Sequence, residues 1–136
     1  MYLLDTNVIS ELRKRKPHGG VIAWISPFFY EELYVPAIAI GELQAGVEIT
    51  RQQDAAKAAE LELWVEKIAT EFTILPMDTS CFREWARMMH GRSSHLNEDA
   101  MVAATASVHQ LTVVTRNVKD FAAFEVPTLN PFTFKN

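Results

Sequence analysis

Five short apolar segments are spread along the chain, and stretches with helical character separate each segment from the next. The apolar segments cover residues 2–5, 32–36, 73–78, 111–115 and 128–132. Between them, apolar residues recur at helical spacing, most clearly over residues 54–72. Strands that alternate with helices in this way are typical of βαβ units, in which a helix connects two parallel strands. The alternation therefore predicts an α/β fold built around a parallel sheet.

Start and stop signals give approximate bounds for the helices. Pro36 suits the start of a helix, Thr79 or Ser80 is expected to cap the helix that follows the third strand, and Gly91 is expected to end it. The sequence HGG at residues 18–20 is expected to end the first helix. Residues 92–97 are predicted to be a polar loop, and the helices are predicted over residues 7–16, 21–28, 37–53, 54–72, 79–91 and 98–110, with a short one within 116–127.

Length and composition indicate one globular domain over residues 1–136. Hydrophobic residues make up 49% of the chain and charged residues 22%, which is ordinary for a folded protein. No apolar run approaches the ~20 residues of a membrane span, and an acid at residue 5 leaves no room for a signal peptide before the first strand. The single cysteine, Cys81, is typical of a reducing compartment, so we expect a cytoplasmic protein without a thiolate zinc site.

The formal net charge of −4 argues against a protein that binds nucleic acid through its own positive charge. The basic run at residues 13–16 ends a predicted helix, where lysine and arginine are favoured and solvated, although an RNA-phosphate contact is the alternative. A group of acids that binds a cation can still act on a phosphate, because the cation reverses the local charge.

Polar side chains follow two of the predicted strands. Asp5 ends the first strand and Thr115 ends the fourth, with Asn117 and Asp120 shortly after it. Ligands of parallel α/β proteins bind beyond the carboxyl ends of the strands. Asp5 could also cap the next helix, but Thr6 and Asn7 can serve as caps too, so the sequence leaves both roles open.

Three further acids are candidates for the same site. Glu42 lies on a largely apolar helical stripe with Ile38, Ala45, Gly46 and Ile49, where a buried carboxylate needs a partner or a metal. Asp99 shares the inward face of its helix with Val102, Ala103 and Ala106, whereas helical phase turns Glu98 away from that face. Asp99 could equally complement the helix dipole, and Asp120 could cap the residues after it.

Four carboxylates at strand ends and helix starts suit a hard cation bound by oxygen, such as Mg²⁺ or Mn²⁺. Other chemical candidates are weaker. His90 and His95 flank the polar loop and are expected to be solvated, although an acid–base pair is the alternative, and Cys81 is expected to be a buried structural residue. The apolar stripe of the long helix could face the core, a dimer partner or an inhibitor; it comprises Leu61, Trp64, Val65, Ile68 and Phe72.

Four motifs in this order resemble those of PIN-domain proteins, and most of all the VapC and FitB-like toxins of type II toxin–antitoxin pairs. They are LLDTNVISEL, IAIGELQAGV, EDAMVAATA and VVTRNVKDF, and the similarity extends to the final VPTLNPF. The resemblance implies a PIN fold, with a twisted parallel sheet of four to five strands and helices on both sides. It also implies a Mg²⁺- or Mn²⁺-dependent ribonuclease with catalytic and metal-binding acids Asp5, Glu42, Asp99 and Asp120, supported by Thr6, Asn7, Thr115 and Asn117.

The resemblance carries expectations about partners as well. It implies a homodimer that cleaves RNA and a small VapB-like antitoxin whose arm places an arginine near the acids, with DNA bound only through that antitoxin. One departure is Glu98, because many relatives carry an uncharged residue there. Two other classes stay open: a non-catalytic PIN-like interaction module, and a phosphatase with Asp5 as its nucleophile. The phosphatase is disfavoured because Asn7 stands where that chemistry usually has a second acid.

Overall fold

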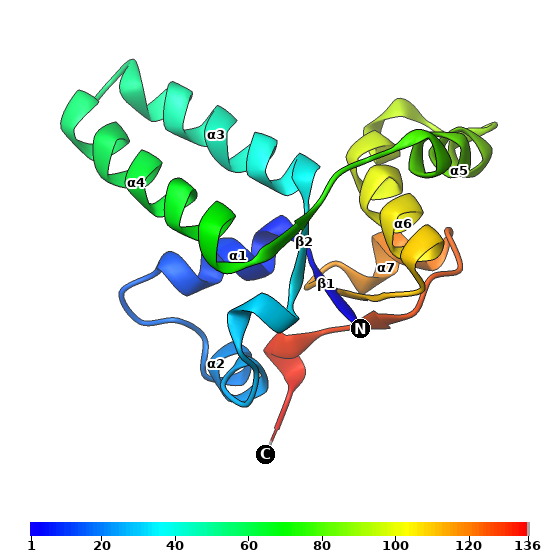
Figure 1. Ribbon diagram of the computed structural model, residues 1–136, viewed down its shortest axis with the longest axis horizontal. Coiled ribbons are helices and arrows are strands. Elements are labelled where there is room, and N and C mark those ends of the chain that lie inside the picture. Colours follow the sequence, from blue (N-terminus) through cyan, green and yellow to red (C-terminus); the bar gives the residue numbers. More distant parts are fainter. Residues whose placement is uncertain (136) are drawn as a thin grey trace.

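The computed structural model describes residues 1–135 and contains one five-stranded sheet in which every strand pair is parallel (Figure 1). The strand order is β3-β2-β1-β4-β5, so β1 lies in the middle. This confirms the predicted parallel α/β architecture. The strands are β1 (Tyr2–Leu4), β2 (Tyr34–Pro36), β3 (Thr73–Leu75), β4 (Thr112–Val114) and β5 (Thr128–Leu129).

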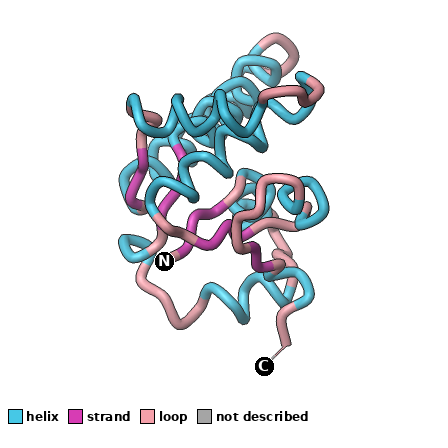
Figure 2. The backbone as a smooth tube through the Cα atoms, turned by 90° about the vertical axis from the view of Figure 1, so that its right-hand side faces the viewer, coloured by secondary structure: helices cyan, strands magenta, loops and turns pink. Residues whose placement is uncertain are grey.

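Helices connect these strands and lie on both sides of the sheet, as expected (Figure 2). None of the helices in residues 1–135 combines the length and apolar character that a membrane crossing needs. The α-helices are α1 (Thr6–Arg13), α2 (Gly19–Ile25), α3 (Ala37–Arg51), α4 (Ala55–Glu71), α5 (Thr79–Met89), α6 (Asn97–His109) and α7 (Val118–Ala122). Short 3₁₀ turns are η1 (Tyr30–Glu32), η2 (Ser94–Leu96) and η3 (Pro131–Thr133).

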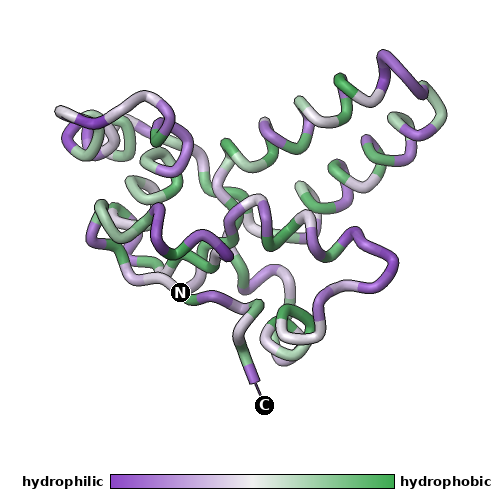
Figure 3. The backbone as a smooth tube through the Cα atoms, turned by 180° about the vertical axis from the view of Figure 1, so that it is seen from behind, coloured by the Kyte–Doolittle hydropathy of each residue, from purple (hydrophilic) through white to green (hydrophobic). Residues whose placement is uncertain are grey.

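Successive residues of the central strands supply two separate cores, because side chains along a strand point to alternate faces. Leu4 and Val114 pack with α1, α2 and the end of α4, whereas Leu3 and Val113 pack with α6 and α7. In Figure 3, hydrophobic and hydrophilic colours alternate along the helices, as expected of helices with one face toward the core. The sheet is therefore buried on both sides, and its carboxyl ends are where a site can form.

The long helix α4 contributes to the core with only part of its apolar stripe. Val65, Ile68 and Phe72 are buried, whereas Leu61 and Trp64 are half-buried and line a cavity between α1, α3 and α4. The helices α3 and α4 form an antiparallel hairpin that rises on one side of the molecule, and α5 and α6 rise on the other (Figure 1).

Several predicted bounds were wrong, each for a local reason. The first helix ends at Arg13 rather than residue 16, because Lys14 already has extended backbone and its amide donates to the Glu11 carbonyl as the C-cap. The HGG sequence begins α2, since His18 Nδ1 accepts a hydrogen bond from the Gly20 amide at 3.0 Å. Asp78 caps α5 in place of Thr79 or Ser80 by accepting from the Cys81 amide at 3.0 Å, and the loop at 92–97 contains η2.

Candidate functional site

Asp5 stands at the point where the direction of chain winding reverses. After β1, the chain adds β2 and β3 next to one edge of β1 and then crosses over to add β4 and β5 next to its other edge. The crevice beyond the strand ends at such a reversal is the usual ligand site of open α/β sheets. Asp5 directly follows β1 and Thr115 directly follows β4, and the Asp5 amide donates to the Val114 carbonyl at 2.9 Å.

The Asp5 carboxylate is 6% exposed and accepts three hydrogen bonds. Its Oδ2 accepts from Thr115 Oγ1 at 2.8 Å and from Asn7 Nδ2 at 3.3 Å. Its Oδ1 accepts from the Thr6 amide at 2.8 Å, so Asp5 is itself the N-cap of α1. Of the residues that could serve as the cap, Thr6 and Asn7 lie inside the helix, so Asp5 has both of the roles that the sequence left open: its carboxylate caps α1 and also faces the site.

The supporting residues form a connected set around Asp5. The Asn117 amide donates to Thr115 Oγ1 at 3.0 Å, and the Arg116 amide donates to Asn7 Oδ1 at 3.2 Å. The hydroxyl of Thr115 therefore accepts a hydrogen bond from the Asn117 amide and donates one to Asp5. Asn117 takes part through its backbone, because its side chain makes no capping bond to α7.

Glu42 reaches the same region from α3. Its Oε1 accepts a hydrogen bond of 2.8 Å from Thr6 Oγ1, which joins it to the start of α1. Burial, followed by the nearby Glu98 carboxyl and the charge of Asp5, raises the pKa of Glu42 to about 7, against the opposing effect of the Thr6 bond. The predicted apolar stripe was only partly right, since Ile49 at its end is 64% exposed.

Asp99 and Asp120 approach Asp5 from the other side. Burial, together with the charges of Asp5, Asp120 and Glu98, raises the pKa of Asp99 to about 6. Burial also raises the pKa of Asp5, and the charge of Asp120 adds to the effect. Asp120 lies in the first turn of α7 rather than capping the residues after it, so that alternative was wrong. The four predicted acids thus act electrostatically as one group.

Glu98 is exposed and Asp99 is half-buried, so helical phase turns Glu98 away from the inward face of α6 as expected, but Glu98 still lies near Glu42. It lines a cavity of about 540 Å³ with Glu42, between α3, α5 and α6, and it raises the pKa of that residue. Because Glu98 and Asp99 both occupy the first turn of α6, they approach the acidic group from neighbouring directions. The sequence signal for this second acid was that two acids stand side by side in the first turn of α6.

Within residues 1–135 no ion pair joins a basic residue to this acidic group, and the charge of His95 only partly opposes the rise in the pKa of Asp99. The ion pairs found in residues 1–135 involve other acids, such as Glu11, whose Oε1 lies 2.9 Å from Lys14 Nζ. In the same residues, no three His, Cys, Asp or Glu side chains are gathered at the spacing of a ready-made metal cluster. The acids are near enough to raise one another's pKa values, but their side chains are not already arranged as the ligands of a metal ion.

The other chemical candidates have structural or solvent-facing roles. His90 is exposed, and His95 Nδ1 lies 2.8 Å from Ser93 Oγ on the exposed loop. Cys81 is buried, and its burial raises the pKa of its thiol. Sequence reasoning missed Glu11, a buried acid of α1 that accepts from the His18 amide at 2.9 Å and holds the turn between α1 and α2.

The chain is a parallel α/β protein whose carboxylates gather where the strand order reverses. Its similarity to known proteins identifies the family. The PIN domain family matches residues 2–126, and the chain belongs to that family. It is 35% identical to Toxin FitB of Neisseria gonorrhoeae, over 97% of this chain and 99% of the relative. It is 34% identical to VapC ribonuclease Y4jK of Sinorhizobium fredii, over 97% of this chain and 98% of the relative.

Solved structures agree over the whole fold. FitAcB from Neisseria gonorrhoeae superposes with a TM-score of 0.86 at 35% identity, covering 98% of this chain and 100% of the matched chain. FitAB bound to an IR36 DNA fragment superposes with a TM-score of 0.79 at 30% identity, covering 100% of this chain and 99% of the other. The predicted PIN-like fold and the resemblance to FitB-like and VapC proteins are confirmed.

Proposed function

We propose that this chain is a metal-dependent endoribonuclease that acts as the toxin of a type II toxin–antitoxin pair. The observation that carries the proposal is the acidic group around Asp5, in which burial and repulsion raise the pKa of Glu42 to about 7 and of Asp99 to about 6. Carboxylates held together without basic partners gain most from a bound cation. The relatives named as ribonuclease and toxin support the same activity.

The residues that would hold Mg²⁺ or Mn²⁺ are Asp5, Glu42, Asp99 and Asp120. Their oxygen atoms are the ligands these hard cations prefer, and a loosely spaced set suits Mg²⁺, which keeps several of its waters. When bound, the ion would supply an activated water for attack on an RNA phosphodiester and would offset charge on the phosphate. We expect products with a 5′-phosphate and a 3′-hydroxyl.

The chain's own contribution is to orient these acids before the substrate arrives. Thr115 and Asn7 hold Oδ2 of Asp5, and Thr6 holds Glu42, so the carboxylates are fixed by donors that favour their ionised forms. A phosphatase with Asp5 as nucleophile is disfavoured because Asn7, which stands where that chemistry usually has a second acid, donates a hydrogen bond to Asp5 instead. The presence of all four acids disfavours a non-catalytic PIN-like module.

We further propose a homodimer inhibited by a small VapB-like antitoxin, with DNA bound only through that antitoxin, in the cytoplasm. The similarity to FitAcB and to FitAB bound to DNA supports this assignment. A cavity of about 400 Å³ between α1, α3 and α4 is lined by Leu61 and Trp64, with Arg13 and Glu42 also at its wall, which suits an arm with apolar residues whose arginine lies at the Glu42 end. A guanidinium can satisfy carboxylates bidentately and would compete with the metal.

Two measurements test the proposal. The purified chain should cleave cellular RNA in Mn²⁺ or Mg²⁺ and lose this activity in EDTA, and sequencing of the cleaved ends should show the predicted termini. Overproduction should arrest growth, and co-expression of the neighbouring antitoxin gene should restore it. If the wild-type chain does no more harm than a soluble Asp5→Asn variant, the toxin assignment is wrong.

A further inference from the structure

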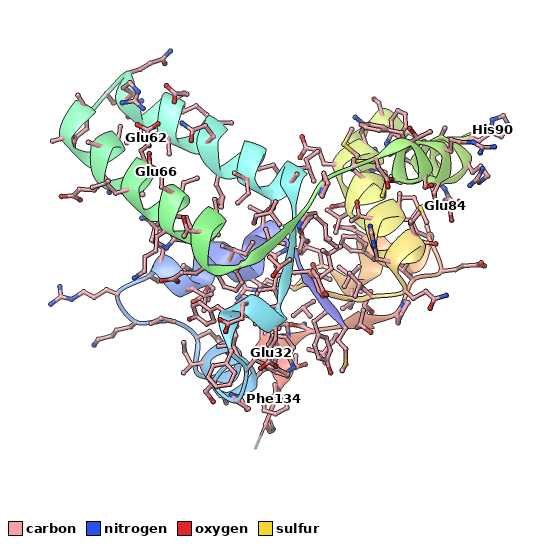
Figure 4. All side chains as sticks on the ribbon, viewed as in Figure 1. Glu32, Glu62, Glu66, Glu84, His90 and Phe134 are labelled. Atoms are coloured by element: carbon pink, nitrogen blue, oxygen red, sulfur yellow. The ribbon has the colours of Figure 1, made fainter. Side chains whose placement is uncertain are left out.

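The segment after β5 packs closely against α2 (Figure 1). It leaves the sheet at the same edge as the loop that follows β4, because β4 and β5 are parallel. Asn130 Oδ1 accepts from the Phe132 amide at 2.9 Å, which fixes the start of η3. Backbone contact with α2 is tight, because a Cβ atom at Gly20 would lie 2.7 Å from the Pro131 carbonyl oxygen. Figure 4 labels Phe134 further along this tail. The tail is therefore seated by its own contacts.

Phe132 uses this seating to hold Arg116. The guanidinium carbon of Arg116 lies 3.9 Å from the centre of the Phe132 ring, within the range of a cation–π interaction. The His18 ring packs edge-on against the same phenyl ring, with 5.3 Å between the centroids. The hydrogen bond from Lys14 is the main cause of the lowered pKa of the buried Glu11 carboxyl of α1, and the positive charge of Arg116 adds to this effect. Arg116 is an exposed residue, but the tail holds its guanidinium group through the Phe132 ring.

The backbone of Arg116 connects this contact to the acidic group. Its amide donates to Asn7 Oδ1 at 3.2 Å, and Asn7 Nδ2 in turn donates to Asp5 Oδ2 at 3.3 Å. The residues on either side of Arg116 belong to the same set, since Thr115 Oγ1 donates to Asp5 and the Asn117 amide donates to Thr115. A displacement of Arg116 would therefore disturb both side-chain donors of Asp5.

We propose that Phe132 is a positioning residue for the acidic site: its ring holds Arg116, and Arg116 holds the loop at 115–117 that orients Asp5. Within residues 1–135, no hydrogen bond or ion pair joins the tail to Asp5, Glu42, Asp99 or Asp120, so the tail acts through the loop. This role rests on the proposed function, since it gives the tail a part in cation binding. Residues that orient ligating carboxylates typically change metal affinity by about 10–100-fold when they are mutated.

Three variants separate this role from simple packing. Phe132→Leu removes the aromatic face but keeps an apolar side chain, whereas Phe132→Trp keeps a face for the guanidinium. Phe134→Leu is the matched control, because Phe134 lies two residues further along the same tail. Two quantities are measured on the full chain: the hydrogen exchange rates of the Arg116 and Asn117 amides without metal, and the affinity for Mn²⁺ by electron paramagnetic resonance.

We expect Phe132→Leu to speed exchange of both amides and to weaken Mn²⁺ binding by about tenfold, while Phe132→Trp and Phe134→Leu stay near the wild type. Unchanged exchange in a folded Phe132→Leu variant overturns the proposal. So does an equal effect of Phe134→Leu, which would indicate general loosening of the tail. The exchange measurement needs neither metal nor RNA, so it decides the positioning role even if the chain cleaves no RNA and the proposed function fails.

Discussion

Thr115 donates a hydrogen bond of 2.8 Å from its Oγ1 to Oδ2 of Asp5, across 110 positions of sequence. The bond is buried and joins the residue after β4 to the residue after β1. Because these two strands are neighbours in the sheet, pairing Leu4 with Val114 places the two side chains together. Thr115 therefore holds the most buried acid of the site in one orientation.

The substitution Thr115→Val keeps the shape of the side chain but removes this donor. A buried acceptor left with one partner fewer costs about 1–3 kcal/mol, so the free energy of unfolding should fall by that order. Mn²⁺ affinity should fall about 10–100-fold, as for other residues that orient metal ligands. Calorimetry and Mn²⁺ titration measure the two effects. Thr105→Val is the control, since Thr105 is equally buried but donates to the Met101 carbonyl.

The acidic group should make the metal-free protein less stable as the pH rises. The pKa of Glu42 is about 7 in the folded chain against an ordinary 4.5, so folding favours its protonated form. Its stabilising contribution is complete below about pH 4.5 and is lost as the pH rises through about 7. The Tm in EDTA should fall across this window, with a shallower slope in Glu42→Gln. A Tm that is flat or rises there in both proteins contradicts the assignment.

The two adjacent acids of α6 should differ in importance. Asp99→Asn should reduce RNA cleavage to background, because Asp99 lies beside Asp5 and Asp120. Glu98→Gln should leave most of the activity and should lower the pKa of Glu42, because it removes the neighbouring negative charge. Initial cleavage rates at saturating Mn²⁺ and the pH dependence of Mn²⁺ binding test this order. Equal losses would show that Glu98 holds the cation as directly as Asp99.

Asp5→Asn should remove activity while the chain stays folded. The Oδ1 atom that caps α1 is retained by asparagine, and the loss of one negative charge relieves repulsion in the group. Against this, the new amide group would face the Asn7 amide, which also donates. We therefore expect a Tm shift of a few degrees in EDTA, which corresponds to about 1 kcal/mol. A loss of helical signal at room temperature would indicate that capping is the dominant role.

Much of the fold could be predicted from the sequence because local physics specifies it. Apolar runs such as 111–115 and the helical spacing over 54–72 determine which segments become strands and helices, and parallel connectivity places Asp5 and Thr115 at the same edge. Helix ends were less predictable. Asp78 and His18 cap their helices in competition with near neighbours, and small differences in backbone geometry decide between such candidates.

Residue type and periodicity were enough to predict the parallel sheet and to single out four acids near its strand ends. Which polar groups touch one another depended instead on how the elements pack. The direction of Glu98 depends on where α6 begins relative to α3, and the contact of Phe132 with Arg116 depends on how the tail seats on α2. Both contacts join residues far apart in the chain, and their geometry comes from the packing of whole elements, which no local pattern encodes.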